Sequence, residues 1–176
     1  MAERPKRGGG WLSIGLVFAG AILFGFLVLP RLSGTLVGGP APDFALDVIH
    51  GGQGPGRVRL SEQRGKLLLL DFWASWCGPC RAQTHVLDAI RKRYADLVII
   101  GVNVSDAPDA AREYLAQVKP PWVVVEDSEG SAAGAYGAQA LPTVVAIDRE
   151  GKVFAVRRRF VPERELAAII DGMAPR

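Results

Sequence analysis

Residues 71–80 read DFWASWCGPC, and they contain both cysteines of this 176-residue chain. The apolar run LLLL at 67–70 precedes them, as expected for a buried strand. A charged, helix-favouring segment at 81–94 follows them. Two thiols at this spacing, at the start of a helix, can close a small disulfide ring and reopen it. The stretch therefore predicts a redox-active cysteine pair between a central strand and a helix.

The order of the two thiols predicts their chemistry. Cys77 comes first, at the helix N-terminus, where unpaired N–H groups and the helix dipole favour negative charge. A thiolate attacks disulfides, so Cys77 is the candidate nucleophile that forms a mixed disulfide with substrate, and Cys80 then attacks Cys77 to release it. Pro79 suits the first helical turn, and Gly78 lets another backbone come close. Trp76 is expected to be an exposed apolar contact for substrate.

Two other uses of a cysteine pair compete with redox chemistry. A purely structural disulfide across so short a loop removes little chain entropy, so it would stabilise the fold weakly. A tetrahedral zinc site needs four ligands, and the chain offers only His50 and His85 besides the cysteines. We therefore expect no metal site, and no cofactor other than the redox-active disulfide Cys77–Cys80.

The stretch at 71–80 resembles the active site of thioredoxin almost residue for residue. From about Pro40 to about Ile170, the chain resembles the membrane-anchored thioredoxin-like reductases of bacteria, the TlpA, ResA and CcmG group of the AhpC/TSA-Redoxin superfamily. The resemblance implies an α/β thioredoxin-like fold, with a central mixed sheet and helices on both faces. It also implies an N-terminal β-hairpin, a central αβ insertion and one preceding transmembrane helix.

Hydrophobic periodicity indicates the same alternation of strands and helices. Short alternating runs at 44–49 and 57–60 surround the sequence GGQGPG, which indicates a β-hairpin. Further strands are expected at 66–73, 97–104, 122–125, 144–148 and 153–160, and helices from the cysteine pair to 94, at 108–118, at 131–136 and from Pro162 onward.

The resemblance also implies roles for two groups outside the cysteine motif. Asp71 lies near the end of a buried strand, where burial raises the pKa of a carboxyl group. The matching aspartate of thioredoxin accepts the proton of the second cysteine, which implies this role toward Cys80; a hydrogen-bonded strand-end carboxylate is the alternative. Pro142 matches the cis-proline opposite the thioredoxin active site. A cis bond there would expose the backbone of Leu141 to an extended substrate, and an ordinary trans-proline is the alternative.

Two positions depart from the pattern of the group. Three residues after Cys80, many TlpA-like reductases carry a glutamate that tunes the thiols, whereas this chain has Gln83. Asp71 is then the only carboxyl group that matches the family. His85 replaces a proline that kinks the helix in thioredoxins, and we assign it no catalytic role.

The N-terminus has the pattern of a membrane anchor. Residues 1–10 are basic and glycine-rich, and residues 11–30 carry no charge and are long enough to span a bilayer as a helix. A cleaved secretory signal is the alternative, but its apolar region is normally shorter and ends at a small-residue cleavage site. The basic residues place 1–10 in the cytoplasm. A linker at 31–42 then leads to a thioredoxin-like domain at 43–176, on the periplasmic or extracellular side of the cell membrane.

Composition makes a nucleic-acid partner unnecessary. Apolar residues form 49% of the chain, which is ample for a core, and the formal net charge is only +3. The one dense basic run, Arg157-Arg158-Arg159, falls in an expected strand. Alternation along a strand would split the triplet across two faces, so we interpret it as a solvated edge.

These observations predict a membrane-anchored thiol–disulfide oxidoreductase that reduces disulfides of exported proteins. In the group that the chain resembles, a frequent substrate is the haem-binding cysteine pair of apocytochrome c during cytochrome c maturation, and a transmembrane thiol transporter supplies electrons. A dithiol oxidase, a peroxiredoxin-type thiol peroxidase and a binding or holdase module are the alternatives. Peroxiredoxins need a Pro-x-x-x-Thr-x-x-Cys loop, which the sequence FWASW before Cys77 does not provide, and a holdase leaves the cysteine pair unexplained.

The Gly-Pro dipeptide between the cysteines, as in thioredoxin, indicates a reducing pair. Thioredoxin lies near −270 mV, whereas the oxidant DsbA lies near −120 mV because it stabilises its thiolate much more strongly. Here one helix N-terminus favours the Cys77 thiolate, and Asp71 would oppose a second negative charge. We therefore expect a reduction potential between roughly −220 and −280 mV.

Overall fold

The computed structural model describes residues 36–51 and 56–173. The predicted cytoplasmic N-terminus at 1–10 and the predicted anchor at 11–30 lie outside these residues. Among the residues that are described, no helix combines the length and the apolar character needed to cross a membrane.

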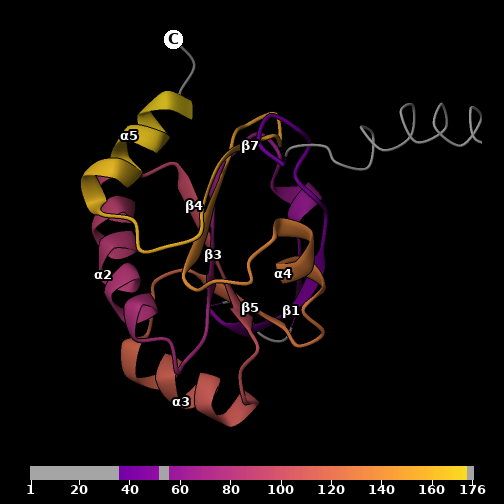
Figure 1. The fold of residues 1–176 in the computed structure, drawn as a ribbon, viewed down its shortest axis with the longest axis vertical. Coiled ribbons are helices and arrows are strands. Elements are labelled where there is room, and N and C mark those ends of the chain that lie inside the picture. Colours follow the sequence, from indigo (N-terminus) through magenta and orange to yellow (C-terminus); the bar gives the residue numbers. More distant parts are fainter. Residues whose placement is uncertain (1–35, 52–55, 174–176) are drawn as a thin grey trace, which may run out of the picture. The chain divides into compact units, whose positions relative to one another are not determined.

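One mixed sheet forms the centre of the described domain (Figure 1). Its strands are β1 (Ala45–His50), β2 (Arg57–Arg59), β3 (Leu67–Trp73), β4 (Leu97–Val104), β5 (Val123–Asp127), β6 (Thr143–Ile147) and β7 (Val153–Arg157). They lie in the order β2-β1-β5-β4-β3-β6-β7. Strands β3, β4 and β5 are parallel, and the other neighbouring pairs are antiparallel. This arrangement confirms the thioredoxin-like fold, with the predicted β1–β2 hairpin added at one edge.

Helices cover both faces of the sheet (Figure 1). On one face lie α2 (Gly78–Arg93), α3 (Pro108–Val118) and α5 (Glu163–Met173). On the other lie α4 (Ser131–Tyr136) and the 3-10 turn η1 (Leu60–Gln63). The sheet therefore separates two hydrophobic cores.

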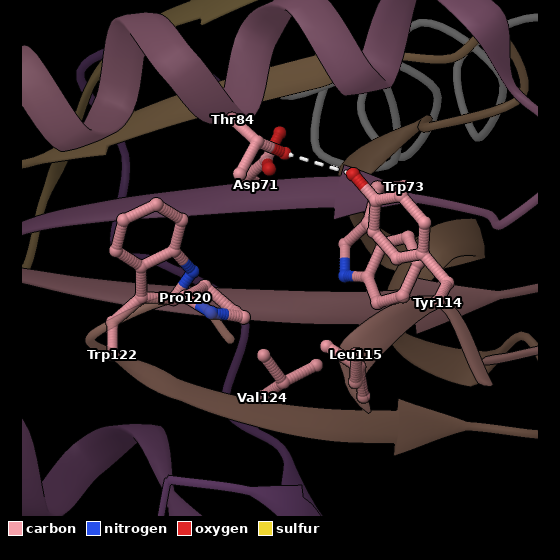
Figure 2. Close-up of a pocket in the computed structure, with 8 residues that line it drawn as sticks. All are labelled: Asp71, Trp73, Thr84, Tyr114, Leu115, Pro120, Trp122 and Val124. Carbon is pink, nitrogen blue, oxygen red and sulfur yellow. Dashed lines mark hydrogen bonds between the residues drawn. The ribbon is translucent and has the colours of Figure 1, made fainter. Parts of the chain in front are cut away.

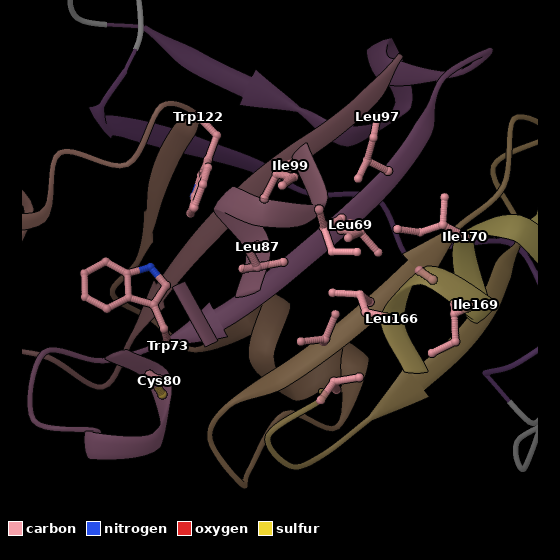
Figure 3. Packing of buried hydrophobic residues seen from close by; sticks show 14 of the residues in the cluster. Leu69, Trp73, Cys80, Leu87, Leu97, Ile99, Trp122, Leu166, Ile169 and Ile170 are labelled. Atoms are coloured by element: carbon pink, nitrogen blue, oxygen red, sulfur yellow. The ribbon is translucent and has the colours of Figure 1, made fainter. Parts of the chain in front are cut away.

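Strand β3 contributes to both cores because its side chains alternate between two covered faces. Leu69 and Trp73 belong to the core that contains Leu87 of α2 (Figure 3). Phe72 belongs to the other core, where its ring centroid lies 5.6 Å from that of Tyr136 in α4. All residues of β3 are buried, which explains the continuous apolar run in the sequence.

The sequence pattern predicts that β7 extends to residue 160, but the strand ends at Arg157. After Arg157, the buried Gln83 side chain of α2 binds the backbone and holds it outside the strand. The Val161 backbone N–H donates to Gln83 Oε1 at 2.7 Å, and Gln83 Nε2 donates to the Val161 carbonyl at 3.3 Å. Residues 158–159 consequently lie outside the strand, so the prediction that strand alternation splits the arginine triplet is wrong.

The topology gathers several loops at one end of the sheet. Parallel strands β3, β4 and β5 end there, and β6 begins there, with Thr143 opposite Phe72. The chain enters at the other end, where Gly38 donates a backbone hydrogen bond to Val153 at 2.7 Å. Loops that follow parallel strands at one edge commonly form the functional site.

Candidate active site

Cys77 and Cys80 form a disulfide at the start of α2, with an S–S distance of 2.01 Å. Cys77 is the N-cap of the helix, and the Cys80 backbone N–H donates to Cys77 Sγ at 3.2 Å. Pro79 lies in the first turn, where its missing N–H costs no helical hydrogen bond. The exposed fraction is 4% for Cys77 and 1% for Cys80. Cys77 is thus the more accessible of the two, and a negative charge on its sulfur would be stabilised by the helix N-terminus.

The loop that carries Cys77 is held by the residues that follow β4. The Asp106 carboxylate accepts a hydrogen bond from the Ser75 backbone N–H at 2.5 Å and another from the Ser75 hydroxyl at 2.8 Å. The Trp76 indole N–H donates to the Ser105 carbonyl at 3.0 Å. Sequence analysis did not identify Asp106. Its place directly after a strand parallel to β3 is the signal that points to it.

Arg81 is a second residue that sequence analysis did not identify. Its Nη2 donates to the Ser75 carbonyl at 3.2 Å, and its guanidinium lies 4.9 Å from the ring centroid of Tyr114 in α3. Among the described residues, Arg81 forms no ion pair. It therefore adds an uncompensated positive charge beside the cysteine loop, which favours a thiolate at Cys77.

Asp71 occupies the face of β3 that α2 covers, and it is 2% exposed. Its Oδ1 atom has no hydrogen-bond partner among the described residues. Burial raises the pKa of Asp71 from 3.8 to about 7. The structure thus contains the buried carboxyl group that the sequence predicts. The alternative, a hydrogen-bonded strand-end carboxylate, would need a donor to Oδ1, and no described residue provides one.

A small cavity of about 10 Å³ lies beside Asp71 (Figure 2). The hydroxyl groups of Thr84 and Tyr114 contribute polar atoms to its lining, and they lie 3.3 Å apart. Thr84 also donates to the Cys80 carbonyl at 3.1 Å. A space of this size accommodates about one water molecule, and a carboxyl and two hydroxyl groups are the partners that a buried water needs. The polar lining of the cavity therefore suits one water molecule beside the Asp71 carboxyl group.

A groove of about 520 Å³ lies beside the cysteine loop and joins two of the predicted substrate-binding residues, Trp76 and Leu141. Trp76 is 66% exposed, and Gly78 and Pro79 are also exposed. The Leu141–Pro142 peptide bond is cis, as predicted. A groove without charged side chains suits an extended polypeptide. The other lining residues are Val104, Ser105, Gly130, Ala133, Gly134, Ala138 and Gln139.

The Gln83 side chain, a departure from the family pattern, has a positional role. It is fully buried within one turn of Cys80, and its amide both donates to and accepts from the Val161 backbone. A carboxylate could accept the N–H but could not donate to the carbonyl. Gln83 therefore fixes the loop between β7 and α5 without placing a titratable group near the cysteines.

The two histidines that could act as zinc ligands do not lie together with the cysteine pair. His50 ends β1, where its Nε2 lies 2.9 Å from the Pro120 carbonyl, and His85 is exposed on α2. Across residues 36–51 and 56–173, no group of three His, Cys, Asp or Glu side chains is arranged to hold a metal ion. The two cysteines are bonded to each other.

Comparison with known proteins identifies the family of this domain. The family model described as Redoxin matches residues 36–170. The chain belongs to the Redoxin family. Within this family it is a thioredoxin-like thiol–disulfide oxidoreductase of the ResA and DsbE type.

Similar oxidoreductases come from several bacteria. The thiol:disulfide interchange protein DsbE of Pseudomonas fluorescens biotype C is 30% identical, over 82% of this chain and 84% of its own length. The thiol-disulfide oxidoreductase ResA of Geobacillus thermodenitrificans is 28% identical, with 79% of each chain covered. A crystal structure of a DsbE-type interchange protein from Chlorobium tepidum matches with a TM-score of 0.67 and 35% identity, covering 76% of this chain and 97% of that one. Each of these matches covers at least 76% of this chain.

The buried Asp71 makes the stability of this oxidoreductase depend on pH. Its pKa is raised to about 7 in the folded chain, so folding favours the protonated form. That stabilisation is complete below the ordinary pKa of 3.8 and is lost as the pH rises through about 7. Between about pH 4 and about pH 8, we expect Asp71→Asn to gain about 4 kcal/mol of unfolding free energy relative to the wild type.

Urea denaturation of both proteins at the two pH values measures this difference. Asp109→Asn, at an exposed site on α3, is the control and should show no comparable gain. A constant difference between Asp71→Asn and the wild type at both pH values would contradict the raised pKa.

Proposed function

We propose that this chain is a membrane-anchored dithiol reductase that reduces disulfides of exported proteins. The observation that carries the proposal is the cysteine pair at the start of α2, with Cys77 as the N-cap. The helix N-terminus and Arg81 favour a thiolate at Cys77. Trp76 and Leu141 line a neutral groove in which a substrate polypeptide can lie.

In the proposed reaction, two electrons pass from the dithiol to a substrate disulfide. The Cys77 thiolate attacks one substrate sulfur and forms a mixed disulfide, and the other substrate sulfur leaves as a thiolate that takes up a proton. Asp71 accepts the proton of the Cys80 thiol. The Cys80 thiolate then attacks Cys77 Sγ, and the second substrate sulfur leaves and takes up a proton. The chain is left with the Cys77–Cys80 disulfide that this structure contains.

A thiol donor must reduce this disulfide before the next turnover. We propose a transmembrane thiol carrier as the donor, because a domain outside the cytoplasm has no access to cytosolic reductants. Exported proteins with a cysteine pair, such as apocytochrome c, are the proposed substrate class. The similarity to proteins named ResA and DsbE supports this class.

Residues 11–30 are proposed to hold the chain in the cytoplasmic membrane as a single-pass anchor, with residues 1–10 inside. We expect N-terminal sequencing of the membrane fraction to start at Met1 or Ala2, because the uncharged segment is long enough to span. Alkaline extraction should leave the chain in the membrane. A mature chain that begins after Gly34 and is recovered without membranes would instead identify a cleaved signal.

Single cysteine replacements separate the two proposed steps. Cys77→Ser should abolish disulfide reduction, whereas Cys80→Ser should accumulate mixed disulfides because the resolving thiol is missing. Mass spectrometry of non-reduced peptides identifies the sulfur that carries the substrate, and the captured proteins identify the substrates. The double variant is the control and should capture nothing. If Cys77→Ser carries substrate on Cys80 at the level expected for Cys77 in Cys80→Ser, the roles of nucleophile and resolving thiol are reversed.

A further inference from the structure

The arginine triplet at the end of β7 has no role in the proposed reaction. Arg158 is exposed, and its guanidinium donates to the Gly137 carbonyl at 2.6 Å and to the Tyr136 carbonyl at 3.2 Å. Among the described residues it has no acidic partner. Because both acceptors are neutral, its positive charge is not compensated. The contact also fixes Arg158 to the segment that leads into Leu141 and the groove.

The other two arginines of the triplet share one carboxylate. Arg157 Nε lies 2.8 Å from Glu165 Oε1, and Arg159 Nη2 lies 2.8 Å from the same atom. Hydrogen bonds from Arg157 and Arg159 lower the pKa of Glu165. Three guanidinium groups against one carboxylate leave an excess of positive charge. Phe160 follows them and is 37% exposed.

Strand register places the triplet at the active-site end of the sheet. Arg157 lies opposite Val144, which lies opposite Asp71. Residues 158–159 continue from there toward the end at which β3 leads into Cys77. The hydrogen bonds between Gln83 and Val161 hold this segment against α2.

Two acidic side chains at this end, apart from the paired Glu165, lie on the other side of β3. Asp106 and Glu129 follow β4 and β5, next to Ser105 and Gly130, which line the groove. In the sheet, β4 and β5 lie on one side of β3, and β7 lies on the other. The neutral groove consequently has acidic residues beyond one flank and the arginine triplet beyond the other, so its surroundings distinguish the two directions in which a charged polypeptide can lie.

We propose that Arg158, Arg159 and Phe160, here called the arginine ledge, bind an acidic segment that flanks the cysteine pair of the substrate. The proposal rests on the proposed function, because it specifies which substrate disulfides the site prefers. Guanidinium groups bind carboxylates in a planar, bidentate geometry, and Phe160 adds an apolar contact. Excess positive charge also raises the rate of encounter with an acidic partner.

Peptides with the same internal Cys-x-x-Cys disulfide test the ledge. One peptide carries three aspartates before the cysteines, a second carries them after, and a third carries asparagines instead. The reduced full-length chain in neutral detergent is mixed with each peptide, and the rate constant of reduction is measured. At about 20 mM salt we expect one of the two acidic peptides to react about fivefold faster than the asparagine peptide. The advantage should disappear at about 500 mM salt.

Single substitutions locate the effect. Arg158→Gln and Arg159→Gln should each reduce the advantage of the acidic peptide and leave the rate of the asparagine peptide unchanged. Arg57→Gln is the matched control, because it removes the same charge from β2 at the opposite edge of the sheet. If Arg158→Gln slows both peptides, the substitution has displaced the backbone that Arg158 binds. Arg159→Gln then decides the question, because the Arg159 side chain bonds Glu165 and the Phe160 carbonyl instead.

Failure of the ledge and failure of the proposed function give different results. Equal rates for all three peptides, or equal gains with aspartates on either side, would overturn the ledge and leave the reductase intact. If no peptide is reduced, the proposed function fails. The ledge is then tested by alkylating Cys77 with anionic iodoacetate and with neutral iodoacetamide. The relative rate of iodoacetate should fall about twofold in the Arg158→Gln, Arg159→Gln double variant, and an unchanged ratio would overturn the ledge.

Discussion

The packing of α2 against β3 determines the chemistry of this domain. Leu87 of α2 is fully buried in the core that contains Leu69 of β3, so the first turn of the helix is fixed just beyond the end of the strand. Cys77 Sγ therefore accepts an N–H of the helix start. The same packing buries Asp71 beneath α2, where no described residue donates a hydrogen bond to Oδ1. The interface between α2 and β3 thus favours negative charge at Cys77, as a nucleophile requires. The same interface disfavours negative charge at Asp71, as a proton acceptor requires.

Contacts from other elements make the surroundings of this interface rigid. Asp106 holds the backbone of Ser75, and Arg81 holds its carbonyl, so the loop before the cysteines is fixed on both sides. Gln83 fixes the segment after β7 in a similar way. The exposed surface of Trp76 therefore stands in a preformed groove. A substrate segment that binds to preformed groups loses less free energy to ordering than one that must organise a flexible loop.

Local sequence patterns were sufficient where the physical cause is local. The predicted bounds of β4, α3 and α4 agree with the structure, because hydrophobic period and flanking turn residues decide them. Contacts between distant residues were not predictable in this way. Strand β7 stops early because Val161 bonds Gln83, a residue 78 positions away. Asp106 meets Ser75 only because parallel strands end together. The sequence shows at Gln83 only the loss of a carboxyl group, because the two hydrogen bonds of this side chain depend on a segment that the fold brings beside it.

The reduction potential of the Cys77–Cys80 pair most directly tests the claim that this site acts as a reductant. The full-length chain in detergent can be equilibrated with glutathione buffers of graded redox ratio, and the oxidised fraction read by alkylation and mass spectrometry. We predict a potential between roughly −220 and −280 mV, where electrons pass from the dithiol to substrate disulfides. A potential above about −160 mV would contradict this assignment and identify the chain as a dithiol oxidase.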